Sequence, residues 1–108
     1  IENVILGSHE QELLTFLRNE IARRRLLPMS EIENEKTIVI ICEDWFCTNI
    51  EGFLMSIYGE TKPLKIILIL AAQQKNAYLK NKSVLDSGTV FFLNDPDEHD
   101  FRTIVVNQ

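Results

Sequence analysis

The sequence predicts an α/β fold, with a parallel sheet and helices on both of its faces. The apolar runs at 37–42 and 65–72 are continuous rather than alternating, which is typical of strands buried on both faces. Segments with helical spacing lie between such runs, and this alternation along a chain favours a parallel sheet. The 108 residues are enough for one domain with a core of its own.

A short strand and a long helix are expected first. Residues 4–6 are apolar and are followed by Gly7 and Ser8, which indicates a buried strand and its turn. From 9 to 25 the apolar residues recur at helical spacing, and Ser8 can cap this helix. The charged segment 26–36 predicts a mainly irregular connection with room for a short strand at its start.

The remaining chain continues the alternation of strands and helices. Glu43 and Asp44 end the strand at 37–42, and Gly59 follows a short amphipathic helix. The last helix is expected to turn Phe101, Ile104 and Val105 inward. The expected elements are a helix at 49–58, a strand at 65–72, a weak helix around 76–79 and then a loop, a strand at 89–93, and a helix at 97–106.

Composition excludes several classes of function. The net charge is −5 and no basic stripe interrupts it, which argues against nucleic-acid binding. Cys42 and Cys47 are too few for a disulfide scaffold, and their spacing without a nearby histidine does not match a zinc site. No apolar run approaches the roughly 20 residues of a membrane span. We therefore expect no metal, no cofactor and no direct membrane contact.

Several segments resemble the receiver domain of two-component signalling, which has a flavodoxin-like fold. Asp44 ends a strand and Gly52 follows, as in the receiver pattern Asp…Pro-x-Met-Asp-Gly. Residues 87–96 are similar to the receiver segment that runs from Ala-Gly through the fifth strand to Lys-Pro. Residues 66–72 resemble the fourth strand, and residues 4–8 take the place of the first strand and its acidic pair. The resemblance implies a phosphoacceptor pocket around Asp44.

This implied pocket is degenerate. Gly7 and Ser8 stand where a receiver has the carboxylates that hold Mg²⁺. Asp95 replaces the lysine that neutralises the phosphoryl group, and Ala71 or the alanine after it replaces the hydroxyl residue. The resemblance therefore implies a domain that is not an enzyme. The degenerate pocket comprises Gly7, Ser8, Asp44, Ala71 and Asp95.

Segment 26–36 is too short for the full strand and helix that a receiver has at this place. It therefore points to a particular kind of receiver-like domain. An α/β domain with one helix shortened or replaced by a loop resembles the ABL (α/β/loop) domain of the enterobacterial Rcs phosphorelay. The resemblance implies one domain over 1–108, cut from a longer inner-membrane protein and lying in the cytoplasm. It also implies neighbouring kinase-like and phosphotransfer domains, and docking of the response regulator RcsB through its effector domain.

Two groups of residues are candidates for partner binding. Trp45 and Phe46 follow a strand at the carboxyl edge of the sheet, where α/β folds bind ligands, and exposed aromatic residues are common interface anchors. Asp97, Glu98 and Asp100 suit a helix N-terminus and could attract a basic partner.

Two alternative functions remain open at this point. The domain could be a receiver that is phosphorylated on Asp44 with unusual ligands, or a structural spacer without a partner.

Overall fold

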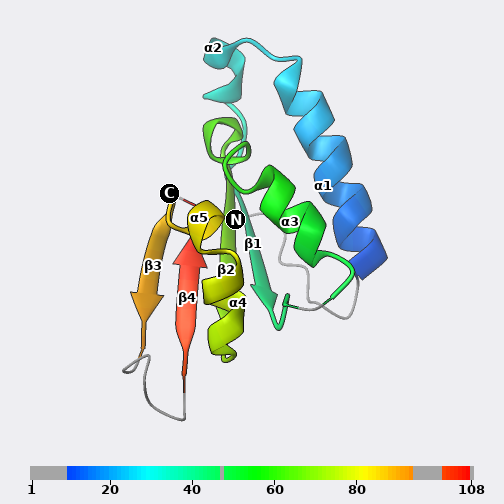
Figure 1. Ribbon diagram of the computed structural model, residues 1–108. Coiled ribbons are helices and arrows are strands. Elements are labelled where there is room, and N and C mark those ends of the chain that lie inside the picture. Colours follow the sequence, from blue (N-terminus) through cyan, green and yellow to red (C-terminus); the bar gives the residue numbers. More distant parts are fainter. Residues whose placement is uncertain (1–9, 47, 94–100, 108) are drawn as a thin grey trace.

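The described residues form ten elements, of which four are strands. The computed structural model describes residues 10–46, 48–93 and 101–107 (Figure 1). The expected strand at 4–6 lies outside these residues. In chain order the elements are α1 (Glu10–Arg25), α2 (Met29–Ile32), β1 (Ile38–Glu43), α3 (Glu51–Ile57), the 3₁₀ turn η2 (Lys62–Leu64), β2 (Ile66–Ala72), α4 (Lys75–Lys80), α5 (Lys82–Leu85), β3 (Thr89–Phe92) and β4 (Thr103–Val106).

The sheet is mixed, which corrects the prediction of a parallel sheet. Its four described strands have the order β1-β2-β4-β3. β1 and β2 are parallel, whereas β4 is antiparallel to both of its neighbours. A flavodoxin-like sheet has its last two strands side by side. Here the strands at the corresponding places, β2 and β3, are separated by β4.

The sheet is mixed because segment 103–106 forms the strand β4. The prediction of a helix for this segment was wrong. This segment is β-branched throughout, and such side chains pack well on a pleated surface. Leu70 faces Val105 on one side of β4, and Val90 faces it on the other. The rest of the expected helix at 97–106 lies partly outside the described residues.

The other elements agree with the sequence more closely. The helices expected at 9–25, 49–58 and 76–79 are confirmed as α1, α3 and α4. The segment 26–36 holds the single short helix α2 and no strand. α5 occupies part of the segment expected as a loop after α4.

The two faces of the sheet are buried to different extents. α3, α4 and α5 lie in front of the sheet in Figure 1, and α1 lies beside α3. Along β2 every second residue is buried and the others are only half-buried. Helices over both faces would bury both rows, so the described residues cover only one face fully. The inward row joins the helices in one core: Leu13 and Leu17 of α1, Leu54 of α3, Ala77 of α4, Leu85 of α5, and Ile40, Leu68 and Val105 of the strands.

Asn107 holds the end of β4 in the centre of the sheet. Its Oδ1 accepts a hydrogen bond of 2.8 Å from the Leu68 backbone N–H. Its amide nitrogen donates to the Tyr58 carbonyl at 3.2 Å and to the Thr61 hydroxyl. Gly88 lies against the same strand, because a Cβ there would be 2.2 Å from the Val106 carbonyl oxygen. β4 is therefore fixed by polar contacts as well as by its pairing.

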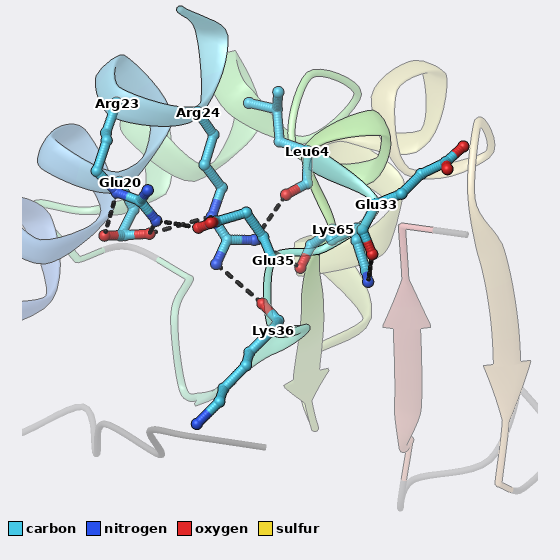
Figure 2. A network of polar contacts seen from close by, with 8 residues as sticks. All are labelled: Glu20, Arg23, Arg24, Glu33, Glu35, Lys36, Leu64 and Lys65. Carbon is cyan, nitrogen blue, oxygen red and sulfur yellow. Dashed lines mark hydrogen bonds and ion pairs between the residues drawn. The ribbon is translucent and has the colours of Figure 1, made fainter. Parts of the chain in front are cut away.

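Arg24 connects α1 to the starts of both parallel strands (Figure 2). Its guanidinium is 2% exposed and donates to the carbonyl of Leu64 at 2.8 Å and to that of Lys36 at 2.9 Å. It also pairs with Glu20 at 3.1 Å, and Glu35 lies 3.8 Å away. Because β2 begins just after Leu64 and β1 just after Lys36, one side chain sets the position of both strands relative to the helix.

We predict that Arg24→Ala lowers the free energy of unfolding by about 3 kcal/mol, because it leaves the buried Leu64 carbonyl without its donor and removes one of the two arginines that pair with Glu20. Chemical denaturation by urea measures this change. Arg25→Ala is the matched control, since Arg25 is exposed and only pairs with Glu60 on the surface. It should cost less than about 1 kcal/mol. Equal losses in the two variants would contradict the role given to Arg24.

The same network predicts a dependence of stability on pH. Hydrogen bonds from Arg23 lower the pKa of Glu20 and of Glu35 below their usual 4.5, with further help from Arg24. A carboxyl group with a lowered pKa in the folded state stabilises the fold above its unfolded pKa, and this contribution is lost as the pH falls through the folded pKa. We expect the urea concentration at the midpoint of unfolding to decrease as the pH is lowered below about 4.5. Glu20→Gln should reduce this slope, whereas Glu31→Gln, exposed on α2, should leave it unchanged.

Candidate functional site

A pocket of about 280 Å³ lies at the carboxyl ends of β1 and β2. β4 runs in the opposite direction, so its first residues meet the last residues of β1 and β2 at this edge. Leu93, which follows β3, also lines the pocket. The lining residues are Glu43, Asp44, Ala71, Ala72, Gln73, Leu93, Arg102, Thr103 and Ile104.

Asp44 has a backbone conformation that presents it at the rim of this pocket. It follows β1 with φ of 52°, in the left-handed region that few residues other than glycine adopt. Aspartate tolerates this region better than most residues do. Asp44 and Glu43 are both exposed, and neither has a hydrogen-bond or ion-pair partner among the described residues.

The groups around Asp44 differ from those that phosphoryl transfer needs. Ala71, at the neighbouring strand end, has no hydroxyl to donate, and the Thr103 hydroxyl is occupied by a 2.9 Å hydrogen bond to the Phe91 carbonyl. Arg102, directly before β4, contributes a cation to the same pocket and is already engaged in an interaction. The described residues contain no cluster of three or more side chains suited to a metal ion.

The structure brings together two of the predicted pocket residues, Asp44 and Ala71. The other three, Gly7, Ser8 and Asp95, lie outside the described residues. The predicted acidic group also lies outside them: Asp97, Glu98 and Asp100. Sequence reasoning did not find Arg102 in the pocket, because the element that carries it was expected to be a helix.

Trp45 and Phe46 are placed differently from each other. Trp45 is 1% exposed and belongs to the core, so its side chain is not presented to a partner as the sequence suggested. An apolar side chain after a strand can turn to either side, and the ring of Trp45 packs at 80° against that of Phe46. Phe46 is half-buried, with the Lys80 ammonium 5.5 Å from its ring centre. Only Phe46 remains accessible.

The strongest exposed apolar feature was not predicted as a surface. Phe91, Phe92 and Leu93 are 50%, 43% and 60% exposed, and they belong to β3 or directly follow it. In the sequence this segment has the composition of a buried strand. β3 is exposed because it lies at the edge of the sheet, with β4 as its only described neighbour.

Cys42 shows no sign of a reactive thiol. It is buried in β1, and burial raises the pKa of its thiol to about 11. It packs within the apolar core as a small apolar residue would. The second cysteine, Cys47, lies outside the described residues.

Comparison of the chain with protein-family models, with curated proteins and with solved structures finds no match. Among the helices in the described part of the chain, none combines the length and apolar character needed to cross a membrane.

We predict that the stability of variants at Asp44 depends on how well the new residue adopts the left-handed backbone conformation. Asp44→Gly should keep or raise the free energy of unfolding, by up to about 0.5 kcal/mol, because glycine adopts this φ without steric cost. Asp44→Val should lower it by about 1 kcal/mol or more, since β-branched residues are strained there. Thermal unfolding of the two variants checks the order, and a more stable valine variant would contradict it.

Proposed function

We propose that this domain is a non-catalytic interaction module of a bacterial phosphorelay. Its partner is the response regulator RcsB, bound through the effector domain close to a phosphotransfer domain. The proposal rests first on the resemblance to the ABL domain of the Rcs phosphorelay, most of all to that of the phosphotransfer protein RcsD. It includes a parent protein in the inner membrane, with this domain on its cytoplasmic side.

The observation that carries the proposal is the pocket at Asp44. A carboxylate stands at the place of a phosphoacceptor, but the neighbouring strand end offers Ala71 and a second carboxylate, Glu43, lies beside it. Phosphoryl transfer to a carboxylate needs cations and hydrogen-bond donors around the incoming group. The exposed apolar residues of β3 favour binding of a protein instead, because large exposed apolar patches usually mark interaction surfaces.

Docking of this kind needs only modest affinity. A binding site that is tethered beside a transfer domain raises the local concentration of the regulator, to about the millimolar range for short flexible linkers. A dissociation constant on the order of micromolar would then keep the site occupied while allowing exchange.

A second candidate function is a receiver that accepts a phosphoryl group on Asp44. One observation favours it: Arg102 lines the same pocket and supplies a cation from an element that receivers do not use there. Mg²⁺ with beryllofluoride tests this function directly. Shifts of the amide signals around Asp44 and Ala71 would support it, and an unchanged spectrum would exclude it.

We predict that the isotope-labelled domain, titrated with the effector domain of RcsB, shows a compact set of shifting amide signals. Saturation is expected at partner concentrations on the order of micromolar to tens of micromolar. The receiver domain of the same regulator serves as the control. An unchanged spectrum at several hundred micromolar of effector domain would remove the docking function and leave the structural spacer.

A further inference from the structure

One face of the sheet has an apolar surface that the described helices do not cover. By the strand register its rows are Val39 with Ile67, then Ile41, Ile69 and Val106, then Ala71, Ile104 and Phe91. We call this surface the open face. Ile41 is 38% exposed and Phe91 50%, and the other residues of these rows are half-buried. None of them belongs to the core cluster or packs against it.

The dimensions of the open face suit a helix. Neighbouring strands are about 4.8 Å apart, so the four described strands span about 14 Å from the first axis to the last. An α-helix with its side chains is about 10–12 Å wide. Helices that lay one apolar stripe on a sheet are the usual second layer of an α/β domain. One amphipathic helix would therefore cover the rows from Ile41 to Phe91.

The charges at one end of the open face indicate the charge that a partner should carry there. Glu43 lies in the row of Ala71 and Ile104, and Asp44 follows it at the rim of the pocket. Both carboxylates are exposed and have no partner among the described residues, whereas Arg102 across the pocket is already engaged. The chain as a whole carries a net charge of −5. A basic partner is favoured at this end.

We propose that the open face docks an amphipathic helix of a basic protein domain. The apolar stripe of that helix lies on Ile41, Ile104 and Phe91, and its Lys or Arg side chains pair with Glu43 and Asp44. This inference rests on the proposed docking function and assigns it a surface, with the effector domain of the response regulator as the basic partner.

The apolar part of the proposal is tested by titrating the effector domain into variants of the chain. Ile41→Ser and Phe91→Ser should each weaken binding about tenfold, because each removes a large exposed apolar side chain from one of the two outer strands of the face. Leu26→Ser is the matched control, since Leu26 is 86% exposed but lies at the end of α1, outside the open face. It should bind as the unchanged chain does.

The charged part is tested by Glu43→Lys, which changes an exposed side chain and leaves the core intact. At low salt it should weaken binding by about fivefold to tenfold, and the difference should shrink near 0.5 M salt, where charges are screened within a few ångströms. Glu31→Lys on α2 carries the same change of charge away from the face and should have little effect. Because Glu43 is exposed at the end of β1, Glu43→Lys keeps the proposal testable even where Ile41→Ser or Phe91→Ser impairs folding.

The outcomes separate the surface from the function. If the unchanged chain does not bind the effector domain, the docking function itself is overturned. If it binds, and Glu43→Lys and Phe91→Ser bind equally well, the function stands and the open face is not its site. Concentration-dependent shifts of open-face amides in the domain alone would assign the face to a second copy. Contacts of these residues with residues 4–6 that persist with partner present would assign it to the chain itself. Either result would overturn the proposal.

Discussion

The buried guanidinium of Arg24 is the constraint on which the arrangement of the helices and the sheet depends. It joins the last turn of α1 to the residues that precede β1 and β2, through the buried carbonyl of Leu64 and the partly buried carbonyl of Lys36. A charge at this depth is tolerated only because Glu20 and Glu35 lie beside it. The parallel strand pair therefore starts from a fixed point, and the carboxyl ends of the strands, where the pocket lies, follow from that start.

β4 is the second determinant of the site. An antiparallel strand between β2 and β3 brings Arg102 and Thr103 to the edge where Glu43 and Asp44 end β1. In a parallel sheet all residues at this edge would come from the carboxyl ends of strands. The pocket therefore combines residues from two strand directions, which makes its polar groups differ from those of a receiver even where the strand ends correspond.

The parts of the fold that local sequence determines were predictable. The continuous apolar runs of β1 and β2 and the helical spacing of α1 identify their own elements, and with them Asp44 and Ala71 at neighbouring strand ends. β4 was not predictable in the same way, because Phe101, Ile104 and Val105 are spaced as on a helix. Its strand conformation depends on Leu70 and Val90 across the sheet, which are distant in sequence. Arg102 was missed for the same reason, and the exposure of Phe91 depends on β3 lying at the edge.

The central place of β4 also has a consequence for how the chain folds. β4 is the last of the described strands to leave the ribosome, yet both β2 and β3 pair with it. Until it arrives, the two earlier strands have unpaired backbone edges and exposed apolar side chains, a condition that invites association between unfinished chains. Closing the sheet requires contacts that span long stretches of sequence, such as Asn107 with Leu68, and such topologies fold slowly. Completion of the sheet is therefore a late and cooperative event, controlled by β4, the last of the described strands.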